Sequence, residues 1–217
     1  MSLRSEGIWW DVVRFGFRLL YHEMAFTYDL VSAVVSLGQW RCWQRTALPY
    51  LPAPSDGVVL EIAHGTGNLQ LDLKQEGYQT VAYDYSVQMG KIAQSKLTRH
   101  GLDGLFVRGQ AQQLPFASNS FCAIVCTFPT HFIVQEETLR EAYRVLQVGG
   151  VMVIVLNGVL RGNGMIERGL EWLYHITGQR EQSDKNTSTY FEGYDFIIET
   201  TIVDCERSQA QLVILRK

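Results

Sequence analysis

The sequence predicts an α/β fold with a mostly parallel β-sheet, a C-terminal antiparallel hairpin and an N-terminal helical segment. Three observations support this class. Short apolar runs alternate with helix-patterned segments over residues 58–156, which is typical of βαβ units around a buried parallel sheet. Residues 196–215 break that rhythm with two strand-like runs and a short polar link. Residues 1–50 are rich in aromatics and hold few glycines or prolines.

The N-terminal segment ends at a proline-rich boundary. Its apolar residues recur at helical spacing, so we expect two or three helices within residues 1–50. The stretch Leu48–Gly57 holds three prolines within six residues, which indicates a rigid linker. We therefore divide the chain into a helical lid at 1–50 and a main domain at 51–217.

The main domain is expected to place its elements in a regular order. Strands are predicted at 58–62, 79–83, 105–108, 121–126 and 151–156, and helices at 67–76, 87–99 and 135–146. Gly77 follows the first of these helices, where a left-handed cap residue is preferred. The runs 196–203 and 210–215 are joined by DCERSQ, which is too short for a helical crossover. An antiparallel hairpin therefore completes a sheet of seven strands.

Composition indicates a globular chain without a nucleic-acid partner. The 217 residues are 47% hydrophobic and 19% charged, with a net charge of −3 and a pI of about 6.0. No strong positive field would attract nucleic acid. Charged residues interrupt the apolar N-terminus, so we expect neither a secretory signal nor a spanning helix of roughly 20 apolar residues.

The four cysteines predict no metal site. Cys42, Cys122, Cys126 and Cys205 form no C-x-x-C pair, and their spacing suits neither zinc nor a disulfide framework. We therefore expect a reducing, cytoplasmic compartment. Cys122 and Cys126 lie four residues apart in one predicted strand, so they should face the same side and pack in the core instead of reacting as thiols.

A loop of small residues, AHGTGN at 63–68, follows the first strand and opens a helix. Ligands of parallel α/β sheets bind at this edge, and Gly65 and Gly67 allow a close backbone approach. Free N–H groups at a helix start favour an anionic group, either a carboxylate or a phosphate. Glu61 ends the first strand beside the loop and would repel a pyrophosphate.

Asp84 ends the second strand, 23 residues after Glu61, where an acid suits the hydroxyls of a ribose. The expected ligand therefore has an amino-acid-like end and a nucleoside, but no phosphates. S-adenosylmethionine fits that description. The alternative is a helix-capping glycine turn without any ligand.

The stretches VLEIAHGTG (59–67), VAYDYSVQM (81–89), GQAQQLPFASNSFCAIVCTF (109–128) and EAYRVLQVGG (141–150) follow one another in this order. Together they resemble the class I S-adenosylmethionine-dependent methyltransferases, which have a Rossmann-like sheet. The resemblance implies that the methionine part is held by Glu61 and by the backbone of Ala63, His64, Gly65, Thr66 and Gly67. It implies that Asp84 binds the ribose and that the adenine is contacted by Tyr85, Met89, Gln110, Ala111 and Gln112, with Thr127 and Phe128 on the methyl-transfer side.

The chain departs from the family pattern at three of these positions. Ala63 replaces the first loop glycine, His64 replaces a small or polar residue, and Gln110 replaces an aspartate that accepts from the adenine amino group. The Gln110 side chain still offers a carbonyl oxygen. Residues 22–50 are similar to the start of the ubiquinone/menaquinone-type C-methyltransferases, which implies that Tyr28 and Asp29 lie near the donor.

Methyl transfer from a sulfonium is an in-line displacement, so the protein chiefly aligns and desolvates the reactants. His131, just after the fourth strand, is the candidate catalytic base; the alternative is a histidine packed at a loop edge. His22 and His175 are weaker candidates. Three interpretations of the N-terminal aromatics stay open: a lid over an apolar acceptor, a cover for the flank of the sheet, or a peripheral membrane contact through its helix.

The sequence therefore predicts a methyltransferase that uses S-adenosylmethionine, yields S-adenosylhomocysteine and modifies a small or lipid-like apolar acceptor. Residues 161–189 are expected to form a helix and a loop that wall the acceptor site. Two rivals are kept. A nicotinamide-dependent oxidoreductase would need G-x-G-x-x-G where this chain has AHGTGN. A non-catalytic S-adenosylmethionine-binding module would keep the fold without turnover. Acceptor, methylated atom and oligomeric state are not predicted.

Overall fold

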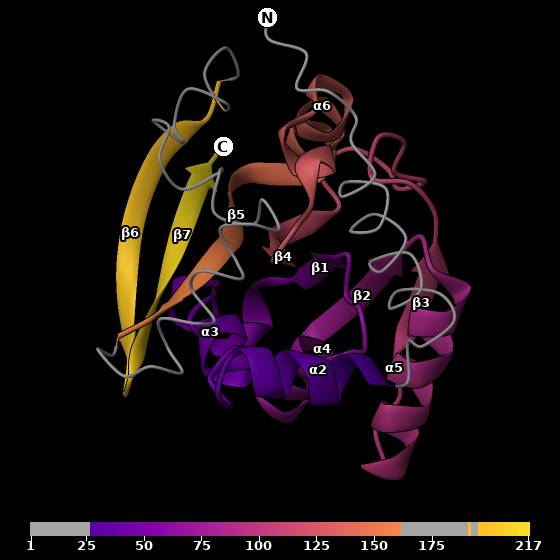
Figure 1. The fold of residues 1–217 in the computed structure, drawn as a ribbon. Coiled ribbons are helices and arrows are strands. Elements are labelled where there is room, and N and C mark those ends of the chain that lie inside the picture. The colour runs from indigo at the N-terminus through magenta and orange to yellow at the C-terminus, as the bar shows by residue number, and fades with distance from the viewer. Residues whose placement is uncertain (1–26, 162–190, 192–194) are drawn as a thin grey trace, which may run out of the picture.

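The computed structural model describes residues 27–161, 191 and 195–217 (Figure 1). Several expectations lie outside these residues. They concern the N-terminal aromatics before residue 27 and their membrane contact, His22 and His175, and the helix and loop of the predicted acceptor wall at 162–189. Across the described ranges, every helix is too short or too polar to cross a bilayer.

The strands form one seven-stranded sheet in the order β3-β2-β1-β4-β5-β7-β6, which confirms the predicted fold class. Neighbours from β3 to β5 pair in parallel, whereas β7 runs antiparallel to both β5 and β6. The strands are β1 (Val58–Ile62), β2 (Gln79–Asp84), β3 (Leu105–Arg108), β4 (Phe121–Thr127), β5 (Leu146–Leu160), β6 (Ile197–Cys205) and β7 (Ser208–Arg216). The hairpin at the C-terminus is therefore present as expected.

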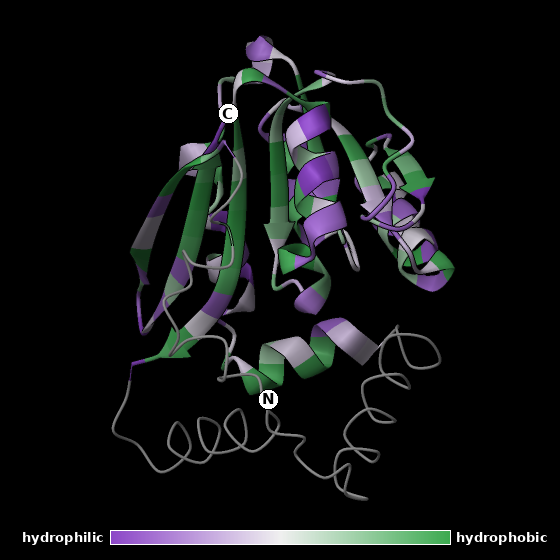
Figure 2. Ribbon diagram, turned by 90° about the horizontal axis from the view of Figure 1, so that it is seen from above, coloured by the Kyte–Doolittle hydropathy of each residue, from purple (hydrophilic) through white to green (hydrophobic). Residues whose placement is uncertain are grey.

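Helices cover both faces of this sheet. The described helices are α2 (Tyr28–Val35), α3 (Trp40–Arg45), α4 (Asn68–Gln75), α5 (Val87–Arg99) and α6 (Glu136–Val145), with short 3-10 turns η3 (Leu48–Tyr50), η4 (Pro54–Asp56) and η5 (His131–Val134). Figure 1 shows α6 on the opposite side of the sheet from α3, α4 and α5. In Figure 2 the central strands are mostly hydrophobic, whereas the helices show both colours. This pattern is expected where amphipathic helices bury one face against a sheet.

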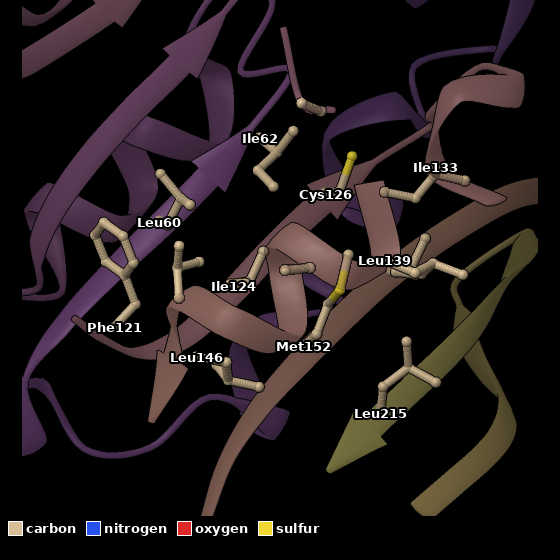
Figure 3. Packing of buried hydrophobic residues seen from close by; sticks show 14 of the residues in the cluster. Leu60, Ile62, Phe121, Ile124, Cys126, Ile133, Leu139, Leu146, Met152 and Leu215 are labelled. Carbon is tan, nitrogen blue, oxygen red and sulfur yellow. The ribbon is translucent and has the colours of Figure 1, made fainter. Parts of the chain in front are cut away.

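Two apolar clusters, one on each face, hold the layers together. The cluster beneath α6 joins Leu139 to Ile124 of β4 and Met152 of β5 (Figure 3). The cluster on the other face joins Trp43 of α3 and Leu69 of α4 to the sheet. Every residue of β4 is buried, because β4 lies in the middle of the sheet with both of its faces covered.

The prediction that Cys122 and Cys126 face the same side is wrong. Cys122 belongs to the cluster under α3 and α4, and Cys126 belongs to the cluster under α6. The register of β4 against β5 shifts between Phe121 and Ala123, so the pairing is irregular at Cys122. Such an irregularity breaks the simple alternation of faces that the spacing of four assumes. Both thiols are buried and free, as expected for core residues.

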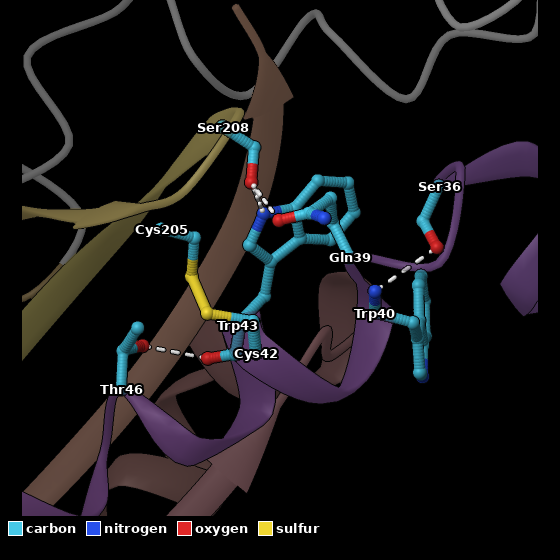
Figure 4. Close-up of a disulfide and its surroundings, with 8 residues drawn as sticks. All are labelled: Ser36, Gln39, Trp40, Cys42, Trp43, Thr46, Cys205 and Ser208. Carbon is cyan, nitrogen blue, oxygen red and sulfur yellow. Dashed lines mark hydrogen bonds between the residues drawn. A yellow bond between two sulfur atoms is a disulfide. The ribbon is translucent and has the colours of Figure 1, made fainter.

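The expectation of no disulfide is also wrong. Cys42 of α3 is bonded to Cys205 at the end of β6, with a Cα–Cα distance of 6.3 Å and a sequence separation of 163 (Figure 4). Spacing patterns show local cysteine frameworks, and this pair is brought together only by the finished sheet. The argument for a reducing compartment rested on the missing disulfide, so it loses that support.

The disulfide lies beside a buried tryptophan that fixes α3 on the sheet. Trp43 Nε1 donates to Ser208 Oγ at 2.8 Å, and Ser208 Oγ donates to Gln39 Oε1 at 3.0 Å (Figure 4). A Cβ added at Gly158 of β5 would lie 2.1 Å from the Trp43 ring, so the ring packs flat on backbone that only glycine provides. The last helix of the predicted lid is therefore part of the core.

Strand β5 is much longer than predicted. β5 continues to Leu160 because β7 pairs with it as far as Ser208. It also begins at Leu146, where the sequence predicts the end of a helix, and passes Gly149 with φ of 78°. Periodicity shows the apolar centre of such a strand but not the polar length that a partner strand adds.

Candidate functional site

Two carboxylates end neighbouring parallel strands. Glu61 is the fourth residue of β1 and Asp84 is the last residue of β2, and the two strands pair in register up to Ile62 and Tyr83. Parallel strands present their carboxyl ends at one edge of the sheet, so both acids lie there beside the loop of residues 63–67. This is the edge where the sequence predicts a ligand.

The Glu61 carboxylate is completely buried, at 0% exposure, and neither of its oxygens has a hydrogen-bond partner within the described residues. Burial raises the pKa of Glu61 to about 8, and the negative charges of Asp84 and Asp72 act in the same direction. Gln70 opposes this rise in pKa, but its Nε2 makes no hydrogen bond of accepted geometry. A buried, unpartnered acid of this kind calls for a cationic or hydroxylic ligand.

Asp84 fixes the loop to the sheet. Its Oδ2 accepts from the N–H of Gly65 at 3.0 Å, and its Oδ1 accepts from the N–H of Ser86 at 2.7 Å. Ser86 in turn caps α5, since its hydroxyl accepts from the N–H of Met89 at 3.3 Å. The carboxylate is therefore held by two backbone donors, and each oxygen keeps a lone pair for a further donor.

The loop itself alternates left-handed residues. Ala63, Gly65 and Gly67 have φ of 58°, 55° and 77°, which favours glycine at each position and is sterically costly at Ala63. A Cβ on Gly65 would meet no described atom within 4 Å, so the loop faces open space there. A Cβ on Gly67 would lie 2.6 Å from the Cβ of Ala93, so this glycine serves the packing of α4 on α5.

His64 points into the protein. It is 4% exposed, its Nδ1 lies 2.8 Å from the carbonyl oxygen of Gly65, and its ring meets the edge of Phe106 at 5.4 Å between centroids. Burial lowers the pKa of His64, although the charge of Asp84 opposes this. The ring is therefore neutral at pH 7 and is not a surface contact for a ligand.

A polar cluster ties α2 to the loop. The carboxylate of Asp29 accepts from Thr66 Oγ1 at 2.5 Å, from Asn68 Nδ2 at 3.0 Å and from Lys96 Nζ at 2.8 Å. Burial would raise the pKa of Asp29, but the bonds from Lys96, Thr66 and Asn68 outweigh it and lower the pKa. The sequence indicates Asp29 through the family resemblance, whereas no pattern pointed to Asn68 or Lys96.

This cluster matters because α2 buries little else. Ser32 is the buried residue of α2, while Leu30 is 67% and Val34 is 61% exposed. The ring of Tyr28 also meets the ring of Trp40 edge-on, with 6.1 Å between centroids. The contact of α2 with the loop therefore depends strongly on the carboxylate of Asp29.

The residues predicted to surround the adenine differ in burial. Tyr85 is 56% exposed, whereas Met89 is fully buried. The guanidinium of Arg108 lies 5.5 Å from the centroid of the Tyr85 ring, and its Nε donates to the Tyr85 carbonyl at 3.0 Å. Arg108 is a further residue of this edge that sequence reasoning missed, since a single arginine ending a strand carries no signal.

The stretch from Gln110 to Gln112 is fixed mainly through its backbone. The Tyr83 hydroxyl donates to the carbonyl of Gln110 at 3.1 Å, while the Gln110 side chain is exposed. Ala111 is buried, and Gln112 Nε2 donates to Gln135 Oε1 at 2.5 Å, next to the start of α6. The structure therefore brings this stretch to the same edge of the sheet, directly after β3.

The methyl-transfer side is built from the end of β4 and from α3. Thr127 Oγ1 accepts from Gln44 Nε2 at 3.2 Å, and the other amide atom, Gln44 Oε1, is buried without a partner among the described residues. Phe128 has φ of 52°, and the centroid of its ring lies 4.1 Å from the centroid of the Trp40 ring. Sequence reasoning missed the contribution of α3 to this side.

His131 is exposed and opens η5, five residues after the buried strand residue Cys126. No described residue forms a hydrogen bond with its ring. The structure therefore does not orient it as a base, and its catalytic role stays a prediction.

Comparisons with known proteins agree with this arrangement. A sequence model of the ubiE/COQ5 methyltransferase family matches residues 16–175. A demethylmenaquinone methyltransferase from Beutenbergia cavernae is 37% identical over 136 residues, which are 62% of this chain and 55% of that protein. One from Thermus thermophilus is 34% identical over 63% of each chain. This chain thus spans a little over half of the length of these curated relatives.

Solved structures share the fold. A SAM-dependent methyltransferase from Thermotoga maritima superposes with a TM-score of 0.61 at 18% identity, covering 91% of this chain and 98% of that chain. The family match covers well over half of the chain, and it includes both acids and the loop between them.

Proposed function

The chain belongs to the ubiE/COQ5 methyltransferase family, and from this premise we propose that it transfers a methyl group from S-adenosylmethionine to a quinone-like, apolar acceptor. The curated relatives named above are demethylmenaquinone methyltransferases, which supports an acceptor with an aromatic ring and an apolar tail. Because the chain spans only part of their length, both the activity and the acceptor are proposals for this chain.

One observation carries the proposal. The buried carboxylate of Glu61 has no hydrogen-bond partner in the part of the chain that the structure describes, and it lies at the edge where Asp84 and the open side of Gly65 also lie. An ammonium group would pair with Glu61, and vicinal hydroxyls would donate to Asp84. The residues present therefore fit the amino-acid end and the ribose of the donor.

The donor, when bound, supplies an activated methyl group on a sulfonium. The protein then has to orient the donor and exclude water. Asp84 and Glu61 orient the two ends of the donor, and the loop that Asp84 fixes approaches it closely. The polar cluster of Asp29 keeps α2 against the same loop, which limits the access of water.

The side of Thr127 suits an apolar acceptor. Phe128 and Trp40 bring aromatic rings to the end of β4, and Gln44 places a buried amide next to Thr127. Aromatic side chains favour a planar, apolar partner. His131 is the candidate that would take a proton from such an acceptor.

The two rival functions receive less support. An oxidoreductase would have to hold an anionic pyrophosphate beside Glu61, at an edge of the sheet where burial already opposes negative charge. A binding module without turnover would keep the fold and these contacts of α3, but the family match and the curated relatives are methyltransferases. The turnover assay separates the two.

The proposal is tested by binding first and by turnover second. Calorimetry should give a 1:1 complex with S-adenosylhomocysteine, and NAD should give no heat and no thermal shift. Methyl transfer is then measured as S-adenosylhomocysteine released with a panel of reduced naphthoquinones and benzoquinones that lack one ring methyl. Binding of NAD in preference to S-adenosylhomocysteine would reject the donor. Turnover with a protein or RNA substrate, and with no quinone, would reject the acceptor.

A cytoplasmic, membrane-peripheral location also belongs to this proposal, while the division at residue 50 stays a prediction. An acceptor with an apolar tail is dissolved in the bilayer, which favours a protein that can touch its surface. Co-sedimentation with vesicles of zwitterionic and of anionic lipid tests this contact. A chain truncated to 27–217 is the matched comparison, and equal sedimentation of both forms would exclude the N-terminal segment as the contact.

A further inference from the structure

Gly65 is held through both of its peptide groups. Its N–H donates to Asp84 Oδ2 at 3.0 Å, and its carbonyl oxygen lies 2.8 Å from His64 Nδ1. A carbonyl oxygen can only accept, so His64 Nδ1 carries the hydrogen of this bond. The imidazole therefore fixes the plane of the peptide that joins Gly65 to Thr66.

The imidazole is well placed to fix that plane. Its ring is buried and rests edge-on against Phe106 of β3, so it has little freedom to turn. Asp84 is the charged group that faces it. A neutral ring has one N–H, and the Gly65 carbonyl fixes that hydrogen on Nδ1.

The orientation of the peptide between Gly65 and Thr66 sets the direction of the Thr66 N–H. The C=O and N–H of a trans peptide point in opposite directions, and no cis peptide is present in the described chain. Because the Gly65 carbonyl faces the buried ring, the N–H of Thr66 faces away from it. Within the described residues no acceptor takes this N–H, and the Thr66 hydroxyl is already engaged by Asp29.

The N–H of Thr66 lies on the loop that follows β1, and the Glu61 carboxylate at the end of β1 has no partner among the described residues. Two such groups at one edge of the sheet are complementary to a zwitterion. Glu61 would pair with the ammonium of an amino acid, and the N–H of Thr66 would donate to its carboxylate. The geometry points to His64 as a positioning residue, which acts through Gly65 to present the Thr66 N–H to the carboxylate of the donor's methionine part. This inference rests on the proposed function, and in it His64 does not touch the donor.

Two substitutions of similar size separate this role from packing. His64→Asn keeps an N–H donor at the place of Nδ1, and His64→Leu keeps the bulk against Phe106 without a donor. Each variant is titrated calorimetrically with S-adenosylhomocysteine and with 5′-methylthioadenosine, which shares the nucleoside but lacks the amino-acid end. We expect His64→Leu to bind S-adenosylhomocysteine about tenfold more weakly. Its affinity for 5′-methylthioadenosine should stay within twofold of wild type.

His64→Asn should bind both ligands nearly as wild type does. An equal loss for both ligands in His64→Leu would contradict the inference, because it would show general damage to the loop. No loss, or the same loss in His64→Asn, would also contradict it. Melting temperatures show whether each variant is folded, and His64→Gln, with its donor one bond further out, replaces a variant that is not. Failure of the wild type to bind S-adenosylhomocysteine would instead overturn the proposed function, and this inference with it.

Discussion

Two regions of the sheet edge are built in different ways: the proposed donor end, made of Glu61, Asp84 and the loop of residues 63–67, and the proposed acceptor side, made of the end of β4 and α3. At the donor end, the bond from Gly65 to Asp84 joins residues 19 apart, and the bond from Thr66 to Asp29 joins residues 37 apart. On the acceptor side, the disulfide of Cys42 spans 163 residues and the bond from Trp43 to its partner on β7 spans 165. The donor end is made of local motifs, and the acceptor side is made by closure of the whole sheet.

The two regions also differ in chemistry. The donor end concentrates carboxylates with perturbed pKa values around a loop that faces open space. The acceptor side is apolar, aromatic and covalently closed. We therefore expect changes at the donor end to alter ligand binding more than stability, and changes on the acceptor side to do the reverse.

The disulfide gives the largest expected effect. Replacing Cys42 and Cys205 by serine together should lower the free energy of unfolding by about 2–5 kcal/mol, because the bond closes a very long loop in the unfolded chain. Denaturant unfolding measures this change, and a dithiol reductant should reproduce it in the wild type but not in the variant. The affinity for S-adenosylhomocysteine should change less than twofold. A tenfold loss of affinity would show that the two regions are coupled, and would contradict the expectation that changes on the acceptor side alter stability and not binding.

Glu61→Gln is expected to weaken ligand binding and, at high pH, to stabilise the folded protein. The folded-state pKa of Glu61, about 8, lies above the ordinary value of 4.5, so the folded protein binds more protons than the unfolded chain between these values. Wild-type stability should therefore fall as pH rises from about 4.5 to 8. At pH 8.5 the variant should be more stable than wild type by up to about 5 kcal/mol, with the difference vanishing below about pH 4.5.

The matched control for this substitution is Glu76→Gln, at an exposed glutamate just after α4. Because Glu61 is intact in this variant, it should lose stability between pH 4.5 and 8 as wild type does in chemical denaturation. Glu61→Gln should also weaken binding of S-adenosylhomocysteine. A variant that loses stability at pH 8.5 would show that the buried carboxylate already has a stabilising partner.

Asp84→Ala should weaken binding of S-adenosylhomocysteine by about tenfold or more, since charged hydrogen bonds to the ribose and to the N–H of Gly65 are lost together. Calorimetry measures the dissociation constant. Asp103→Ala, at an exposed aspartate between α5 and β3, is the control and should bind as wild type does. An unchanged dissociation constant in Asp84→Ala would show that Asp84 does not bind the donor.

The cluster of Asp29 gives the smallest effect. Lys96→Met should speed release of S-adenosylhomocysteine by about threefold, because the ion pair that steadies α2 on the loop is lost. Stopped-flow release at low and high salt measures it. Lys91→Met, at an exposed lysine of the same helix, should leave the rate unchanged. Salt should speed release from wild type but not from Lys96→Met, because ions screen this partly exposed pair. An equal salt dependence of the release rate in wild type and in Lys96→Met would show that the ion pair between Lys96 and Asp29 does not control ligand release.

The sequence predicts the donor end well because its signals are local. β1, β3 and α5 have the predicted bounds, and Gly77 has the predicted left-handed φ, at 87°. The loop and its two acids come to one edge because parallel strands must end together. Within this end, Lys96 and Asn68 were missed, since single polar residues on helices carry no periodic signal.

The acceptor side was less predictable for the opposite reason. The register shift of β4 against β5, beside which Cys122 and Cys126 face opposite sides, depends on the pairing of these two strands. The disulfide and the contact of Trp43 with Gly158 depend on strands that are distant in the chain. Such contacts follow from the register of the finished sheet, which a pattern in one stretch of sequence does not contain.

The central claim is that Glu61, protonated when free, ionises to receive the ammonium of the donor. Calorimetry of S-adenosylhomocysteine binding at pH 7, in buffers of different ionisation enthalpy, counts the protons released. Because the pKa of Glu61 is about 8 in the free protein, we expect release of about one proton per site. No release should occur with 5′-methylthioadenosine or with the Glu61→Gln variant. Binding of S-adenosylhomocysteine without proton release, or with equal release in the variant, would contradict the account.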